Sequence, residues 1–174
     1  MNAAPRPSLD QVWHWLAQVP DPEIPVISLT DLGIIRDAKW QDDMLVVTVT
    51  PTYSGCPATA VINLDIEAAL NEQGVSKVRL ERQLSPAWTT DWISAEGREK
   101  LKTYGIAPPV DGTAADGLLM KRIDRLSGRS NLTIVCPRCG SANTEKISQF
   151  GSTPCKASYR CTDCLEPFDY FKCI

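Results

Sequence analysis

The chain has 174 residues, of which 43% are hydrophobic, with 7 cysteines and a formal net charge of −3 at pH 7. This apolar content is enough for a packed core and excludes a wholly disordered protein, and the length suits one ordinary domain plus a small module. No apolar run approaches the ~18 residues of a membrane span, and no charged-then-apolar leader opens the chain. We therefore expect a soluble, cytoplasmic protein with no membrane partner.

The charge is unevenly distributed along the chain. Residues 1–117 contain 9 Lys and Arg against 16 Asp and Glu, whereas residues 118–131 contain four basic residues and one acidic residue. An acidic body of this size argues against nucleic acid as the principal partner. The basic stretch is expected to form a short amphipathic segment.

The first element predicted is a helix that begins after Ser8. Ser8 and Gln11 have the spacing of a capping box. Apolar residues then recur on one helical face, at Leu9, Val12, Trp13, Leu16 and Val19. Two β-rich runs follow at residues 33–40 and 44–50, and the polar residues between them predict a hairpin.

A second helix and a third strand are predicted next. Residues 57–73 have apolar side chains at helical spacing, and Gly74 is typical of the position just after a helix. Residues 75–82 alternate between apolar and polar side chains, which indicates a strand. The order helix, strand, strand, helix, strand predicts a small α+β domain, which we place at residues 1–105.

The end of this domain is expected to contain one more short helix. Ser94 is suited to cap it and Gly105 to end it, while Trp88 and Trp92 are interpreted as packing anchors or as a lid over the sheet. Residues 106–131 are rich in Gly, Pro, Ala and Asp in their first half, so we expect a linker that continues into the basic amphipathic segment.

The tail, residues 132–174, contains the clearest motif in the sequence. Two CxxC pairs are separated by 21 residues and comprise Cys136, Cys139, Cys161 and Cys164. This spacing predicts a C-terminal four-cysteine zinc ribbon, whose closed tetrahedral shell makes the metal structural. A rubredoxin-like iron centre uses the same ligands and stays the alternative.

Two further cysteines of the tail lie outside these pairs. If the runs on either side of Cys164 form a hairpin, Cys155 and Cys173 lie near each other at its far end. We expect them to form a separate thiol pair outside the zinc shell, with small buried thiols as the alternative.

The seventh cysteine lies in the stretch "PTYSGCPAT", between a predicted strand and a predicted helix. Pro57 suits the first position of the helix, which leaves Cys56 at or next to the N-cap, where the helix dipole stabilises a thiolate. No arginine follows soon after it, as a phosphatase loop requires, and position 59 is Thr59 rather than the second cysteine of a redox motif. Cys56 is therefore a candidate metal ligand or reactive thiol, and a buried filler is the alternative.

Asp21 and Glu23 alternate with prolines in "DPEIP", which stiffens the stretch and fixes the directions of both carboxylates. An ordinary solvated turn is the alternative interpretation. If both carboxylates lay near Cys56, the three anions would raise one another's pKa, and a cation would be needed to hold them together. Carboxylates combined with a thiolate suit iron.

Three stretches together resemble a known family. "DPEIP", then "SLTDLGII", then "PTYSGCPAT" before a helix are similar to the iron–sulfur-assembly domain family, and the resemblance covers roughly residues 8–105. The stretches "LSPAWTTDWIS" and "GIAPP" and the cysteine-rich tail narrow it to the auxiliary proteins of ring-epoxidising phenylacetyl-CoA oxygenases.

The resemblance implies an accessory protein rather than an enzyme. Such a protein helps to mature or deliver an iron–sulfur cluster in aerobic phenylacetate catabolism, with the [2Fe–2S] reductase of the epoxidase as the expected client. The positions that match the family's reactive residues are Asp21, Glu23 and Cys56, and the expected cofactors are a structural zinc ion and a transient iron or iron–sulfur cluster. The sequence itself has one histidine, no Glu-x-x-His pair and no G-x-G-x-x-G fingerprint, which argues against oxidation chemistry of its own.

Two questions stay open at this point. One thiol per chain is too few for a [2Fe–2S] cluster, so a second copy in a homodimer, a partner's thiols, or Cys155 and Cys173 must supply the others. The alternative function is a non-catalytic adaptor that docks on the oxygenase or the reductase through the ribbon and the basic segment, in particular Arg122 and Arg125.

Overall fold

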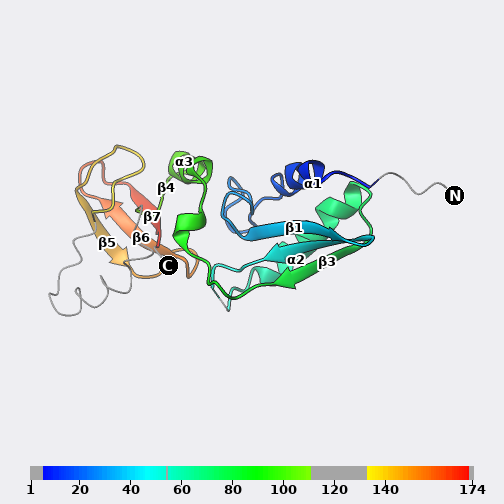
Figure 1. The fold of residues 1–174 in the computed structure, drawn as a ribbon. Helices are drawn as coiled ribbons and strands as arrows, with labels where there is room; N and C mark the ends of the chain where they lie inside the picture. The colour runs from blue at the N-terminus through cyan, green and yellow to red at the C-terminus, as the bar shows by residue number, and fades with distance from the viewer. Residues whose placement is uncertain (1–5, 54, 111–132, 173–174) are drawn as a thin grey trace. The chain divides into compact units, whose positions relative to one another are not determined.

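The computed structural model describes residues 6–53, 55–110 and 133–172 (Figure 1). The chain forms two units, Met1–Trp88 and Thr89–Ile174. The predicted basic segment, residues 118–131, and Cys173 lie outside the described residues. No helix in the described ranges has the length and apolar character needed to cross a membrane.

The first unit opens with helix α1, Leu9–Leu16, which is capped as the sequence predicts. The Ser8 hydroxyl accepts a hydrogen bond from the Gln11 amide at 3.2 Å, and the Gln11 side chain accepts one from the Ser8 amide at 2.9 Å. Val12 and Leu16 are fully buried. The capping box is therefore confirmed, and the apolar stripe is confirmed at Val12, Leu16 and Val19, whereas Leu9 is 40% exposed.

A three-stranded sheet forms the centre of the first unit, with the order β1-β2-β3. Strands β1, Ile35–Gln41, and β2, Met44–Val49, form the predicted antiparallel hairpin, and β3, Val78–Arg82, pairs with β2 in parallel. Helix α2, Thr59–Glu72, makes the crossover that a parallel pair requires. The expected order helix, strand, strand, helix, strand is confirmed.

The two faces of this sheet differ. Helix α1 contacts β1, α2 contacts β3, and the two helices contact each other, over buried side chains that include Leu45 and Val47. The other face carries exposed ion pairs, Lys39 with Asp37 at 3.7 Å and Arg79 with Glu81 at 2.8 Å. A sheet with one packed and one solvated face is usual for a small α+β domain.

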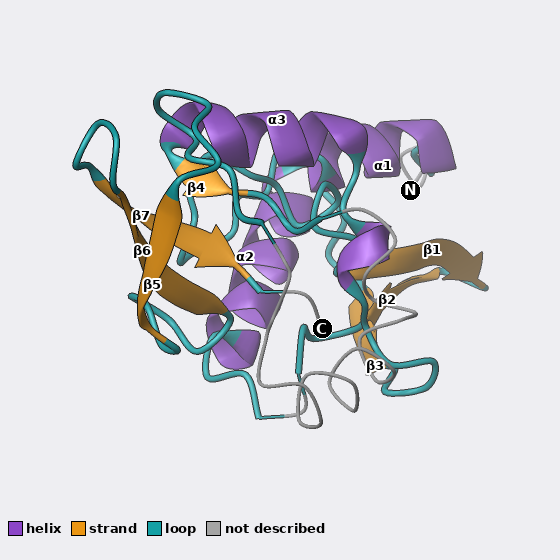
Figure 2. Ribbon diagram, turned by 90° about the vertical axis from the view of Figure 1, so that its left-hand side faces the viewer, coloured by secondary structure: helices purple, strands orange, loops and turns teal. Residues whose placement is uncertain are grey.

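The second unit contains a short 3₁₀ helix, one α-helix and a four-stranded sheet. The helices are η1, Thr90–Trp92, and α3, Ala95–Tyr104. The strands are β4, Ile106–Ala107; β5, Thr144–Ser148; β6, Lys156–Cys161; and β7, Pro167–Phe171. The sheet order is β4-β7-β6-β5, with β4 parallel to β7 and the other pairs antiparallel (Figure 2).

Helix α3 has the ends that the sequence predicts. The Ser94 hydroxyl accepts a hydrogen bond from the Gly97 amide at 2.9 Å. Gly105 follows the last turn with φ 101°, the left-handed conformation that favours glycine. Trp88, expected as a packing anchor, is buried in the first unit and donates its indole N–H to the Leu32 carbonyl at 2.8 Å.

The predicted boundaries differ from the observed ones. The sequence places the end of the first domain at residue 105 and the start of a linker at 106, whereas the division of contacts falls between Trp88 and Thr89. Ile106 is buried in β4, whose partner strand β7 lies far along the chain. A strand of two residues is too short to show the alternation of apolar and polar side chains by which strands are predicted, and its partner strand is distant in the sequence. The sequence therefore predicts a linker at residues 106 and 107.

The core of the ribbon is small. It comprises seven buried residues, Ala107, Ile134, Cys136, Ala157, Cys161, Phe168 and Tyr170. The ring of Tyr159 packs on Phe168 and Tyr170, with centroid distances of 5.9 and 5.7 Å. Because two of the seven are members of the CxxC pairs, a metal ion bound there would cross-link the centre of this core.

Candidate functional site

The two CxxC pairs form two knuckles of the same construction. In the first, the Cys136 amide donates to the Ser141 carbonyl at 2.8 Å, and in the second the Cys161 amide donates to the Glu166 carbonyl at 3.0 Å. Each knuckle turns through a residue with positive φ, Gly140 at 75° and Leu165 at 67°. The turns bring both sulfurs of each pair to one side, as a metal site requires.

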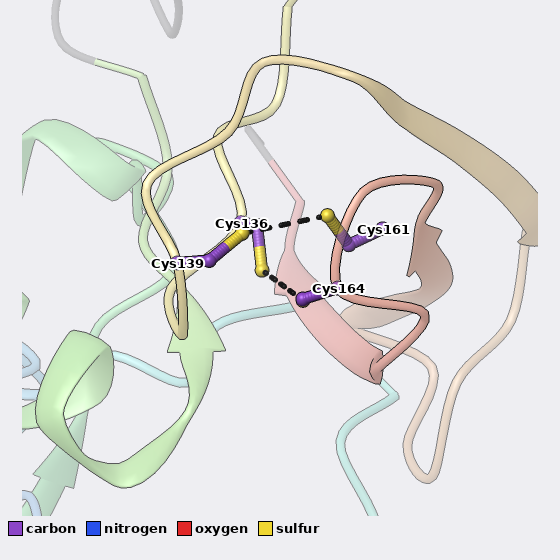
Figure 3. A group of neighbouring side chains, drawn as sticks. All are labelled: Cys136, Cys139, Cys161 and Cys164. Carbon is purple, nitrogen blue, oxygen red and sulfur yellow. Dashed lines mark hydrogen bonds between the residues drawn. The ribbon is translucent and has the colours of Figure 1, made fainter.

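The four sulfurs converge on one point (Figure 3). All four lie within 4.8 Å of one another, with 3.8 Å between Cys136 and Cys164 and 3.6 Å between Cys139 and Cys161. A tetrahedral zinc ion with bonds of about 2.3 Å to sulfur separates its ligands by about 3.8 Å. The cluster therefore fits a zinc ion held by four thiolates, with no position left for a substrate.

The four thiols of this cluster can all be ionised only when a cation is bound among them. A backbone hydrogen bond from Ser141 lowers the pKa of Cys139, but the sulfurs of the other three cysteines and desolvation outweigh it and raise that pKa to about 12. Backbone hydrogen bonds at Cys164 and Asp163 lower the pKa of Cys161 to about 7. Four thiolates at these distances repel one another, so full ionisation requires a bound metal.

Side chains from both knuckles hold the cluster in place. The Asp163 carboxylate accepts hydrogen bonds from the Ser141 hydroxyl and from the Asn143 side chain, which ties the second knuckle to the first. Arg138 donates to the Tyr104 carbonyl at 3.5 Å, which ties the first knuckle to the end of α3. Such contacts fix the orientation of metal ligands.

The hairpin around Cys164 is confirmed, because Lys156 in β6 pairs with Phe171 in β7. Cys155 is buried at its far end, with its sulfur 3.0 Å from the Thr153 hydroxyl, and its carbonyl accepts from the Lys172 amide at 3.0 Å. The proposed partner Cys173 lies outside the described residues, so the thiol pair stays a prediction.

Cys56 is half-buried in a turn that precedes α2. Its carbonyl accepts hydrogen bonds from the Thr59 amide at 3.3 Å and from the Thr59 hydroxyl at 2.9 Å. These bonds close the turn before the helix, so α2 begins at Thr59 with Ala58 as N-cap, and not at Pro57 as predicted. No side chain caps this helix and its first turn has no acidic residue.

Asp21 holds the second candidate loop in shape. Its side chain is 7% exposed, and Oδ1 accepts hydrogen bonds from the amides of Glu23 at 2.9 Å and Ile24 at 2.8 Å. The Asp21 amide donates to the Ile27 carbonyl at 2.9 Å. Asp21 therefore positions the backbone that carries the exposed Glu23 side chain.

The two candidate loops leave the sheet at the same end (Figure 1). Ile35, the first residue of β1, pairs with Val49, the last residue of β2. Beyond this pair, the Thr50 amide donates to the Ile34 carbonyl at 2.8 Å. Segment 20–34 therefore enters β1 where segment 50–58, with Cys56, leaves β2.

The structure does not place the three candidate ligands in one cluster. Among the described residues, one group of Cys, His, Asp or Glu side chains lies close enough together to hold a metal ion, and it consists of the four ribbon cysteines. Asp21, Glu23 and Cys56 do not form such a group. The joint action of these three residues therefore stays a prediction.

One structural pair at this end was missed from the sequence. The Ser28 hydroxyl accepts from the Asp31 amide at 3.1 Å, and the Asp31 carboxylate accepts from the Ser28 amide at 3.3 Å. The spacing "SLTD" before an apolar run is a capping-box signal and could have revealed it. The pair fixes the turn that leads into β1.

Comparison with known proteins gives matches along most of the chain. Residues 9–79 match a family described as iron–sulfur cluster assembly protein, and residues 123–172 match the PaaD zinc beta ribbon domain. Over 168 residues the chain is 46% identical to an Escherichia coli protein named as a subunit of 1,2-phenylacetyl-CoA epoxidase, and the match covers 97% of this chain and 94% of that protein.

Two shorter similarities concern the first part of the chain. A Porphyromonas gingivalis protein named Fe-S protein maturation auxiliary factor is 33% identical over 94 residues, covering 53% of this chain and 89% of that protein. The crystal structure of a domain of unknown function, DUF59, from Bacillus anthracis has a TM-score of 0.49 at 23% identity, covering 53% of this chain and 89% of that chain.

Proposed function

Because this chain belongs to the phenylacetate-degradation protein D (PaaD) family, we propose that it is an auxiliary factor that matures or delivers an iron–sulfur cluster for a phenylacetyl-CoA epoxidase system. The proposed client is the reductase of that system, which we expect to carry a [2Fe–2S] cluster. Support comes from the name of the Escherichia coli relative, an epoxidase component, and from the maturation-factor name of the Porphyromonas gingivalis relative. The chain is proposed to act without catalysing oxidation itself.

The observation that carries the proposal is the position of Cys56. Its half-buried thiol lies on a short turn before an uncapped helix, at the sheet end where the Asp21 loop enters β1. A thiol on a turn can exchange ligands more readily than one inside a closed tetrahedral shell. We assign Cys56 as the labile thiolate ligand of the transferred iron or cluster.

The carboxylates are proposed to assist this thiol. Glu23 is exposed on the loop whose shape Asp21 fixes, and in this scheme its carboxylate supplies an oxygen ligand to a cation bound at Cys56. A [2Fe–2S] cluster prefers four thiolates, so a second copy of the chain or the client's own cysteines would complete the ligand set. In this scheme the ribbon zinc is structural and takes no part in transfer.

The experiment is co-expression of the reductase with the wild-type chain or with Cys56→Ser, followed by anaerobic purification. Iron, acid-labile sulfide and the visible absorbance of the purified reductase measure its cluster content. Cys56→Ser should lower that content several-fold, while Ser76→Ala, a control at an exposed residue outside every candidate site, should leave it unchanged. Equal cluster content with Cys56→Ser and wild type would overturn the proposal.

A second candidate function is the adaptor, which exposed apolar side chains on the ribbon favour. Ile147, Phe150 and Leu165 are 58%, 66% and 61% exposed, so each is available for contact with a partner. An adaptor would keep both partner binding and epoxidase support when Cys56 is replaced. Charge reversal at Arg122 and Arg125 would instead abolish them.

A further inference from the structure

Leu165 has a backbone conformation that does not suit a leucine. Its φ is 67°, a left-handed conformation in which the Cβ atom of an L residue crowds the following carbonyl oxygen. In the described part of the chain one other non-glycine residue has positive φ, Asp42, in the two-residue turn between β1 and β2, where aspartate is well tolerated. Leu165 therefore needs a separate explanation.

The first knuckle shows what the fold alone would select. Gly140 and Leu165 occupy the same place, four residues after the cysteine whose amide closes the knuckle. Gly140 has φ 75° with no atom within 4 Å of a Cβ built there, so its open surroundings do not select glycine. Glycine is favoured at this position by the left-handed backbone conformation itself. The second knuckle has the same conformation, but its residue there is Leu165.

Packing does not explain the leucine either. Its side chain is 61% exposed, whereas Phe168 and Tyr170 on the following strand are buried in the ribbon core. A large apolar side chain that is strained in its backbone and left in water contributes little to folding. Strain of this kind concentrates at functional sites, so the side chain is expected to have a function outside this chain.

The surroundings of Leu165 indicate what kind of surface it meets. Residues 161–167 contain Asp163 and Glu166 and no lysine or arginine, and residues 162–167 are all exposed. Four thiolates around a divalent zinc ion add further negative charge at the base of this knuckle. The second knuckle is therefore an anionic surface with one apolar side chain at its tip.

The nearby cations do not neutralise this surface. Arg138, in the first knuckle, is directed to the end of α3, where it donates to the Tyr104 carbonyl. Arg160, just before the second knuckle, lies opposite Glu145 in β5 and opposite Pro167 in β7. Its single charge leaves the sum of Asp163, Glu166 and a four-thiolate zinc site negative. A partner surface that complements this knuckle in charge and shape is basic and contains an apolar recess for Leu165.

We propose that the second zinc knuckle is a docking point, at which Leu165 inserts into an apolar recess on a basic surface of a partner protein. This proposal rests on the proposed function only for the identity of that partner, a component of the epoxidase system. The strained conformation presents the side chain away from the ribbon core, and the anionic rim steers the basic partner to it.

The test compares wild type with Leu165→Gly as full-length, zinc-loaded proteins. Leu165→Gly should leave the thermal midpoint unchanged or raise it by up to about 4 °C, because relief of the strained φ offsets the greater entropy of glycine in the unfolded chain. Zinc loss to a chromogenic chelator should be unchanged or slower. Affinity for the separately purified oxygenase or reductase, measured by biolayer interferometry, should fall at least about tenfold, as for an anchor side chain at the centre of an interface.

Two further variants sharpen the test. Leu165→Asn tolerates the left-handed conformation and should lose binding equally, which separates the apolar side chain from the backbone. Leu64→Ser removes an apolar side chain that is 65% exposed on α2, outside the ribbon, and should bind like wild type. Wild-type binding should also weaken as salt is raised, because an anionic rim meets a basic surface.

Each alternative outcome overturns the inference. Undiminished binding by Leu165→Gly would show that the leucine is not a contact. A lower thermal midpoint or faster zinc loss in Leu165→Gly would show that the leucine serves the ribbon itself. If the wild-type chain binds neither the oxygenase nor the reductase, the proposed partner is wrong. The role of Cys56 is tested separately, by the cluster content of the reductase.

Discussion

The guanidinium group of Arg138 lies directly against the backbone of Gly105, so close that a Cβ atom at residue 105 would be 2.5 Å from Arg138 Nη2. Gly105 ends α3, and Arg138 lies between the two cysteines of the first knuckle. A cation at a helix C-terminus is favourable because the last carbonyls carry partial negative charge. Arg138 therefore links the end of α3 to the first knuckle of the four-cysteine site.

This contact predicts that Gly105→Ala destabilises the ribbon more than an ordinary change at a left-handed glycine. The variant acquires the strain of φ 101° and must also move the flexible end of Arg138 away from the last turn of α3, so we expect the free energy of unfolding to fall by about 1.5–2 kcal/mol. The matched control is Gly140→Ala, whose φ is 75° in open space and which should cost only about 1 kcal/mol. Thermal or chemical unfolding of both variants measures the difference, and equal losses would show that the Arg138 contact contributes nothing.

Zinc binding should be strongly pH-dependent. At pH 7 the thiols of Cys139, with its pKa raised to about 12, and of Cys164, with its pKa also raised, hold their protons in the metal-free protein. Zinc must displace both, so affinity rises with pH, and release of two protons corresponds to about a 100-fold gain per pH unit. Proton release into a weakly buffered indicator solution measures this, and release of fewer than two protons per zinc would contradict the pKa assignments.

Much of this fold follows from local signals in the sequence. The box at Ser8 and Gln11, the Ser94 cap and the final Gly105 each act within one turn, so spacing alone predicts them. The four-cysteine cluster follows in the same way, since CxxC spacing reflects the geometry of a tight turn. The features that the sequence did not show depend on distant partners, such as the pairing of β4 with β7.

The second candidate site shows where sequence reasoning ends. Spacing indicates that Asp21 and Glu23 lie on a stiff loop and that Cys56 precedes a helix, and the sheet register then brings both loops to one end. Whether their ligand atoms meet depends on side-chain positions that no periodic pattern encodes. The strain at Leu165 is likewise invisible in the sequence until the two knuckles are compared in space.

Alkylation should reveal the cysteine environments in a fixed order. In the zinc-loaded protein the half-buried Cys56 should label first, because the four knuckle thiolates are protected by the metal and Cys155 is buried. After chelation the four knuckle cysteines lose this protection and should label as well. Mass spectrometry of a short alkylation time course measures the order. Early labelling of any knuckle cysteine before chelation would contradict the four-thiolate shell.

Two substitutions of Asp21 distinguish its structural role in the first unit from a role in iron transfer. Asp21→Ala removes the acceptor of two backbone hydrogen bonds and should lower the free energy of unfolding by about 2 kcal/mol, whereas Asp21→Asn retains an acceptor oxygen and should cost less than about 1 kcal/mol. If Asp21 also assists iron transfer through its charge, Asp21→Asn should reduce the cluster content of the co-expressed reductase nearly as much as Cys56→Ser does, despite its stable fold. Urea unfolding and iron analysis on the same preparations decide this. Normal delivery by Asp21→Asn would leave Asp21 with the single role of holding the loop that carries Glu23.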